Sequence, residues 1–182
     1  MPTNFILESK RLTVMPFTEE FLTERYVSWL NDPEVVRYSS QRFKKHTIET
    51  CRQYVKSFEG TPNGFWVILA KDKKLGAIGT MTSYVNIHDV VVDIGILIGE
   101  KSIWGQSYGL EAWVTLCHEF LHHRKVRKIT AGTLFVNQGM LNIMKKSGMR
   151  EDGLRKKQCM IDGKEIDMIY AAFFQGDTVK GR

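Results

Sequence analysis

The sequence has few cysteines and no long apolar run. Its three cysteines are an odd number among 182 residues and form no Cys-x-x-Cys pair, so neither a disulfide framework nor a cysteine zinc site is indicated. No apolar run approaches the roughly 20 residues that a membrane span needs. Residues 1–10 also lack the basic and apolar regions of a secretory signal. We therefore expect a cytoplasmic protein with reduced thiols and no membrane partner.

A dominant charge of one sign is also absent. The net charge of +6 favours anionic partners, but the basic residues are dispersed along the chain. The clearest basic clusters, residues 122–128 and 155–157, carry no interleaved aromatic side chains of the kind that stack on bases. A phosphate-bearing cofactor or substrate explains the excess equally well, so we expect no nucleic-acid partner. A nucleic-acid or protein-binding module is the non-enzymatic alternative.

The spacing of apolar residues predicts a mixed α/β (α+β) fold in one domain over residues 1–182. We expect about seven strands, mostly antiparallel, with four helices and one crossover in the middle of the chain. The Asp162-Gly163 pair predicts a tight hairpin between the last two strands. The expected strands are residues 11–17, 65–70, 75–84, 90–98, 128–136, 151–161 and 165–174, and the expected helices are 18–30, 47–59, 110–121 and 137–146.

A loop with two glycines, Gly105 and Gly109, joins the strand at 90–98 to the helix at 110–121. Glycine lets the main chain approach a ligand closely, and the first amides of a helix have no acceptor within the helix, so such a loop can bind phosphate. The spacing matches neither a Rossmann fingerprint nor a P-loop. For the two glycines alone, a tight turn and a close helix-to-strand contact are the better explanation.

Six stretches, in this order, give the chain a family resemblance. They are residues 29–35, 93–99, 104–112, 128–132, Asn137 with 146–149, and 167–170. Together they make residues 11–173 similar to the GCN5-related N-acetyltransferase (GNAT) superfamily. The similarity is greatest to the branch with ribosomal-protein-alanine and amino-sugar acetyltransferases. The resemblance implies a GNAT-like sheet with a central splay.

The resemblance also implies that acetyl-CoA, as cosubstrate, lies where the strand at 90–98 separates from the strand at 128–136. Its pyrophosphate is expected on the loop amides, and its pantetheine arm is expected to pair with strand amides in the manner of an added strand. The family usually has glycine where this chain has Ser107. Asn137 reads equally well as a helix N-cap. The expected cofactor contacts are Leu97, Ile98, Gly99, Gly105, Gln106, Ser107, Tyr108, Gly109, Leu110 and Asn137.

Acetyl transfer to an amine needs a base, oriented amides and a proton donor. Asp93 stands where many relatives carry a carboxylate, so it is the expected base, acting through water, and His88 is the second candidate. Each could instead be an ordinary exposed residue. Met144 occupies the position at which many relatives have a tyrosine as general acid. The proton would then come from Tyr170, Tyr108 or solvent.

The acceptor is expected to be a small-molecule or peptide amine. Arg37 and Arg42 are expected on the acceptor side, where they could hold phosphate. The favoured acceptor is the amino group of a nucleotide-linked amino sugar, and a ribosomal-protein amino terminus is the alternative. Because Met144 cannot donate a proton, a degenerate acetyl-CoA sensor is a further alternative. Oligomeric state, including a homodimer, is left open.

The sequence also contains a zinc-peptidase pattern, His-Glu-x-x-His, at residues 118–122. Helical spacing places His118 and His122 on a polar face with Glu111 and Thr115, away from the apolar stripe. A catalytic zinc site also needs a third ligand and a buried second shell. We therefore expect no metal, and a zinc peptidase is the remote alternative.

Overall fold

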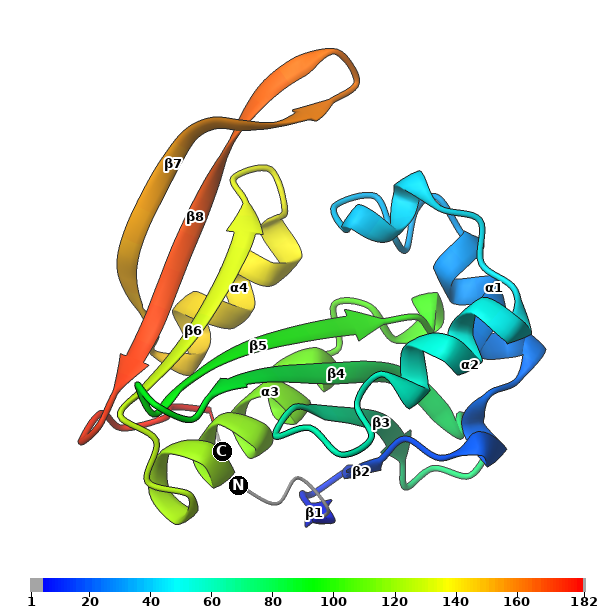
Figure 1. The fold of residues 1–182 in the computed structure, drawn as a ribbon, viewed down its shortest axis with the longest axis horizontal. Helices are drawn as coiled ribbons and strands as arrows, with labels where there is room; N and C mark the ends of the chain where they lie inside the picture. Colours follow the sequence, from blue (N-terminus) through cyan, green and yellow to red (C-terminus); the bar gives the residue numbers. More distant parts are fainter. Residues whose placement is uncertain (1–4, 182) are drawn as a thin grey trace.

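A single eight-stranded sheet carries the fold (Figure 1). The computed structural model describes residues 5–181, and the strand order is β1-β2-β3-β4-β5-β6-β8-β7. All neighbouring strands are antiparallel except β5 and β6, which are parallel. The strands are β1 Leu7–Glu8, β2 Leu12–Pro16, β3 Gly64–Ala70, β4 Ala77–Asn86, β5 Val91–Ile98, β6 Lys128–Leu134, β7 Arg150–Ile161 and β8 Lys164–Phe174.

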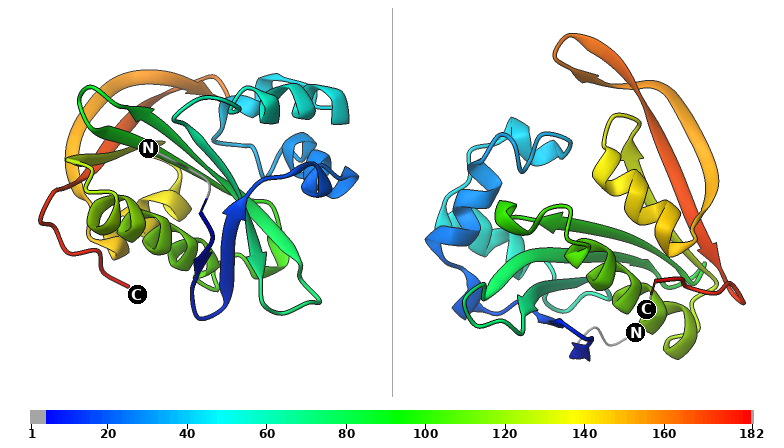
Figure 2. Two further views of the ribbon diagram at one scale, coloured as in Figure 1. Left: turned by 60° about the horizontal axis from the view of Figure 1, so that its bottom comes forward. Right: turned by 180° about the vertical axis from the view of Figure 1, so that it is seen from behind.

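Four α-helices cover the two faces of the sheet. They are α1 Glu24–Asn31, α2 Ile48–Lys56, α3 Tyr108–His118 and α4 Gln138–Ser147. Short 3-10 turns are η1 Glu19–Phe21, η2 Ser40–Phe43 and η3 Lys101–Ile103, and a π-helical turn, η4 Glu119–His123, ends α3. Figure 2 shows α3 and α4 on one side of the sheet and α1 with α2 on the other. No helix among residues 5–181 is long and apolar enough to cross a membrane.

Two apolar cores form because strand side chains alternate between the faces. Trp66 and Ile68 of β3 pack in the core that includes α3, whereas Phe65 and Val67 pack in the core with α1 and α2. This alternation explains why β3 is apolar at almost every position. The predicted mixed α/β class is therefore confirmed.

Two details differ from the expectation. The sheet has eight strands rather than about seven, because Leu7 and Glu8 pair with β2 over a stretch too short to show alternation. The first helix begins after Thr23, not Thr18. The Thr23 side chain accepts a hydrogen bond from the amide of Tyr26, whereas the Thr18 hydroxyl donates to the carboxylate of Glu20 and caps nothing.

The predicted hairpin and the predicted splay are both present. Asp162 and Gly163 have φ of 50° and 74°, the left-handed pair that a two-residue hairpin turn needs. β5 pairs with β6 only from Val91 to Asp93, opposite residues 128–130. Beyond that point β5 continues with β4 and β6 continues with β8, so the two strands diverge (Figure 1). The expected domain also includes residues 1–4 and 182, which lie outside the described residues.

Trp29 of α1 lies flat against Gly99, just after β5. A Cβ added to Gly99 would overlap the part of the indole nearest its attachment, which cannot swing away like the end of a flexible side chain. This contact joins two of the stretches that carry the family resemblance.

We therefore expect Gly99→Ala to lower the free energy of unfolding by about 1 to 3 kcal/mol, because overpacking displaces the indole. Gly153→Ala in β7 is the matched control, since an added Cβ there meets no atom within 4 Å. Its effect should stay within about 0.5 kcal/mol. Urea denaturation measures both variants, and equal stability of the two would contradict the close packing of Trp29 on Gly99.

Candidate functional site

Asp93 lies at the point where the sheet divides. It faces Thr130 in the last residue pair between β5 and β6, and its Oδ2 accepts a 2.7 Å hydrogen bond from the Thr130 hydroxyl. Asp93 is exposed at the surface of the sheet, but neighbouring residues partly bury its carboxylate. This burial raises the pKa of Asp93, and the Thr130 hydrogen bond opposes the rise. A carboxyl group with a raised pKa is suited to proton transfer.

A hollow of about 710 Å³ lies on the face covered by α1 and α2, and Tyr84 and Gly95, which neighbour Asp93 in the sheet, line it. Thr82, Tyr84 and Gly95 from β4 and β5 form its floor, and Tyr84 is the cross-strand neighbour of Asp93. The Tyr84 hydroxyl lies 3.0 Å from that of Tyr54 on α2. Burial, followed by this contact, raises the pKa of Tyr54, so the Tyr54 phenol is a neutral hydrogen-bonding group at physiological pH.

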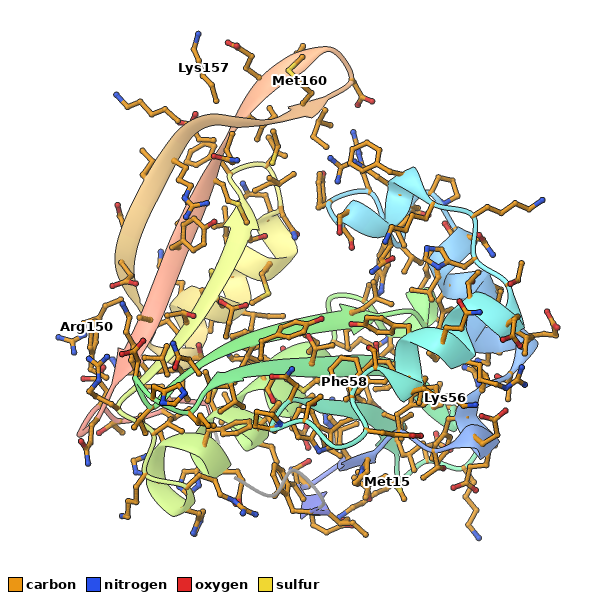
Figure 3. All side chains as sticks on the ribbon, in the orientation of Figure 1. Met15, Lys56, Phe58, Arg150, Lys157 and Met160 are labelled. Atoms are coloured by element: carbon orange, nitrogen blue, oxygen red, sulfur yellow. The ribbon has the colours of Figure 1, made fainter. Side chains whose placement is uncertain are left out.

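A second hollow of about 530 Å³ lies between residues 30–45 and the tip of the β7–β8 hairpin, where Figure 3 labels Met160. Arg37 and Arg42, the two residues expected on the acceptor side, both line it. Arg37 lies 3.5 Å from Asp162 across the hollow. Arg42 donates to the carbonyl of Ser39.

Lys44 and Lys45 join the two hollows, because both residues line both of them. They belong to a basic loop, residues 42–46. Among the described residues that line the hollows, Asp162 is the only carboxylate. The joined hollows therefore carry a strong positive charge and suit an anionic ligand.

Asn31 and Asp32 hold this basic loop in place. Asn31 exchanges hydrogen bonds with the main chain of His46, at 2.8 and 2.9 Å. Asp32 accepts from the amide of Glu34 and forms a 2.8 Å ion pair with Lys101 of η3. The stretch at residues 29–35 thus connects the basic loop to the segment that follows β5.

The glycine loop presents unpartnered amides. Within residues 5–181, the amides of Ser107, Tyr108, Gly109 and Leu110 donate no backbone or side-chain hydrogen bond, whereas the amide of Gln106 donates to Ile103. Ser107 adopts the left-handed conformation, with φ of 63°, that the family's glycine would adopt without strain. These four amides at the start of α3 form a site for an anion.

The amides available on the open edge of β5 are not all the ones that were predicted. The amide of Gly99 is not available, because it donates to the carbonyl of Ile78 on the β4 side. Hydrogen-bonding direction alternates along an antiparallel pair, so Leu97 also faces β4, and Ile96 and Ile98 face the splay. The indole Nε1 of Trp104 donates to the carbonyl of Ile98, which agrees with that direction.

Gly109 and Asn137 lie near the splay in different ways. A Cβ at Gly109 would lie 3.2 Å from Ile143 of α4 and 3.3 Å from Ile98, so this glycine keeps the helix close to the open strand. Gly105 needs its positive φ of 77° but has open space around it. Asn137 accepts from the amide of Met140 and donates to the Thr133 hydroxyl, so its oxygen caps α4 and its nitrogen bonds to β6.

The candidate proton-transfer residues do not all meet at Asp93. His88 lies on the exposed turn before β5, at the closed end of the splay. Tyr108 lies beneath Arg11 at the start of α3. Met144 is buried in the core. Tyr170 is opposite Gly132, two residues from Thr130 and on the same face, so it is the candidate tyrosine that shares a surface with Asp93.

The His-Glu-x-x-His stretch falls where α3 becomes a π-helical turn. The rings of His118 and His122 are 4.5 Å apart, but the Glu119 carboxylate forms a 2.7 Å ion pair with Arg124. Among the described residues, no group of three or more His, Cys, Asp or Glu side chains is arranged to hold a metal ion.

Comparison with known proteins agrees with this geometry. Residues 11–150 match the family described as "Acetyltransferase (GNAT) domain". No curated protein sequence matches the chain significantly.

Solved structures share the fold at low sequence identity. An acetyltransferase of the GNAT family from Bacillus anthracis has a TM-score of 0.80 at 20% identity, covering 95% of this chain and 100% of its own. RimL, a ribosomal L7/L12 alpha-N-protein acetyltransferase in complex with coenzyme A, has a TM-score of 0.80 at 13% identity, covering 93% and 98%. A ribosomal-protein-S5-alanine acetyltransferase from Vibrio fischeri has 0.74 at 15%, covering 95% and 98%.

Proposed function

This chain belongs to the GNAT acetyltransferase family, and we propose that it transfers the acetyl group of acetyl-CoA to a primary amine at the splay between β5 and β6. The observation that carries the proposal is the coincidence, in one splay, of a carboxylate at its base and unpartnered amides at its open end. Acetyl-CoA supplies an acetyl group that is already activated as a thioester.

The residues present fit a phosphate-bearing thioester. The amides of residues 107–110 would bind the pyrophosphate without having to break any bond that they make in the protein. The main chain of Ile96 and Ile98 would pair with the pantetheine amides as an added strand. Trp104 would have to release the carbonyl of Ile98 for that pairing to extend to the end of β5.

Asp93 is the proposed base. It would take a proton from the acceptor amine, through one water, while the Thr130 hydroxyl fixes the direction of its carboxylate. Tyr170 is the proposed proton donor to the leaving thiolate, because its hydroxyl donates only to the weak acceptor sulfur of Met168 and lies on the face that Asp93 shares. His88 is not assigned a role.

The joined hollows support an anionic acceptor. Arg37, Arg42, Lys44 and Lys45 line the joined hollows. The larger hollow reaches Tyr84, the cross-strand neighbour of Asp93, so a phosphate held there would direct an attached amine toward the base. We therefore propose the amino group of a nucleotide-linked amino sugar as the acceptor. A ribosomal-protein amino terminus is the second candidate, because RimL and the S5-alanine enzyme share this fold.

Ser107→Asp and Ser107→Asn form a matched pair that tests where the cofactor binds. Asn and Asp both tolerate the left-handed conformation that Ser107 adopts, and both can cap a helix, so the two variants differ mainly in charge. The carboxylate should repel the pyrophosphate and compete for its amides. We expect acetyl-CoA to bind at least about tenfold more weakly to Ser107→Asp than to Ser107→Asn, equivalent to about 1.4 kcal/mol. Calorimetry measures both, and equal affinities in two folded variants would refute the placement.

Asp93→Asn should lower kcat by about 10²- to 10⁴-fold, while the KM for acetyl-CoA changes little, because the lost group acts on the amine. Thr130→Val should move the acidic limb of the kcat/KM profile to higher pH. The reason is that the Thr130 hydrogen bond lowers the pKa of Asp93, and its removal leaves the rise caused by burial unopposed. A loss of activity below about threefold in Asp93→Asn at pH 7, with the acidic limb unmoved in Thr130→Val, would exclude Asp93 as the base.

An acceptor screen with UDP-amino sugars and basic amino-terminal peptides tests the substrate class. We expect acetylation of a UDP-amino sugar, with Arg37→Gln and Arg42→Gln each raising its KM about tenfold through loss of a charge-assisted contact. Asp162→Asn should act in the opposite direction and lower that KM, because it removes the carboxylate that competes for Arg37. Acetylation of the peptides alone would favour the ribosomal-protein alternative.

A further inference from the structure

Arg11, which immediately precedes β2, contacts the glycine loop and the first turn of α3 at three places. Its Nε forms a 2.6 Å ion pair with the Glu111 carboxylate. Its Nη1 donates to the carbonyl of Gln106 at 3.1 Å. Its guanidinium carbon lies 4.0 Å from the centre of the Tyr108 ring. One side chain therefore reaches both sides of Ser107, from a strand that is about 100 residues away in sequence.

Glu111 fixes the position of this arginine. Its Oε1 accepts from the amide of Arg11 at 2.7 Å and from the hydroxyl of Ser9 at 2.8 Å, while its Oε2 accepts from the Arg11 side chain. Burial alone would raise the pKa of Glu111, but these three bonds together lower it, so the carboxylate stays ionised. The guanidinium is thus paired, and its contacts with Gln106 and Tyr108 follow from where Glu111 holds it.

The loop needs a support of this kind. Ser107 is in the left-handed region, which is unfavourable for a non-glycine residue. The amides of residues 107–110 make no hydrogen bond within residues 5–181 that would hold the loop in shape. Arg11 supplies external contacts on both sides of the strained residue, at Gln106 and at Tyr108.

We propose that Arg11 is a positioning residue for the cofactor. It holds the glycine loop in the strained conformation in which the amides of residues 107–110 point together, and it does so through Glu111 rather than by contacting phosphate. This inference rests on the proposed binding of the acetyl-CoA pyrophosphate to those amides. Arg11 lies in none of the six stretches that carry the family resemblance. The proposal is that this residue, just before β2, sets the affinity for the cofactor.

The test compares Arg11→Met with Arg124→Met. Arg124 forms the same kind of ion pair, 2.7 Å from Glu119, and lies over the Phe5 ring, but it does so at the other end of α3. Both variants lose an arginine, an ion pair and a ring contact, so general destabilisation should be similar. The affinity for acetyl-CoA should fall at least about tenfold in Arg11→Met and less than twofold in Arg124→Met, measured as the ligand-dependent rise in Tm.

S-acetylpantetheine separates loop positioning from general damage, because it has the thioester and the pantetheine arm but no pyrophosphate. Its affinity should be the same in Arg11→Met as in the unaltered protein, within about twofold. The double variant Arg11→Met with Glu111→Gln should bind acetyl-CoA no more weakly than Arg11→Met alone, since the two residues act as one unit. Arg11→Lys keeps the charge but loses the planar fork, and it should show a smaller loss in the same direction.

Equal weakening of both ligands in Arg11→Met, or an unchanged acetyl-CoA affinity in that folded variant, would overturn the role of Arg11. If Arg11→Met does not fold, the same comparison of the two ligands in Arg11→Lys decides the question. These outcomes can be told apart from failure of the proposed pyrophosphate site on the amides of residues 107–110. Equal binding of acetyl-CoA by Ser107→Asp and Ser107→Asn would remove the pyrophosphate from the loop whatever Arg11 does.

Discussion

The parallel pairing of β5 with β6 lasts for three residue pairs, and the arrangement of the site depends on where it stops. A backbone amide or carbonyl that leaves a sheet must find another partner or remain available to a ligand. Past Asp93, β5 keeps β4 on one side and presents Ile96 and Ile98 on the other. The same break leaves the Asp93 carboxylate partly buried at the end of the parallel pairing, where the Thr130 hydroxyl orients it.

Much of this arrangement could be predicted from the sequence because its signals are local. The Asp162-Gly163 turn, the Asn137 cap and the apolar run of β3 each follow from conformational or packing preferences of neighbouring residues. The order of the motifs then indicated the family and, through it, the splay. Thr18 shows the limit of such signals, because Thr23 has the same chemistry five residues later and only packing decided which of them caps α1.

The rest depended on contacts between distant parts of the chain. Sequence spacing could not show that the Gly99 amide is bound by Ile78, or that Lys44 and Lys45 join two hollows that also reach the β7–β8 hairpin. Ser107 looked like a departure from the family's glycine, yet the serine takes the glycine conformation. Arg11 read only as the start of a strand, since its partners Gln106 and Glu111 lie about 100 residues away.

The splay also affects how the chain reaches its folded state. Strands β1 to β5 pair with neighbours along the chain and can form as residues 7–98 are synthesised. β6 arrives next, but it can make only three pairs with β5, and its other partner, β8, begins 30 residues after β6 ends. Until β8 is made, most of β6 is an open strand edge, and such edges can pair with other chains. The divergence that creates the proposed cofactor site therefore makes the β6 segment, during synthesis, the part of this sheet most exposed to association with another nascent chain.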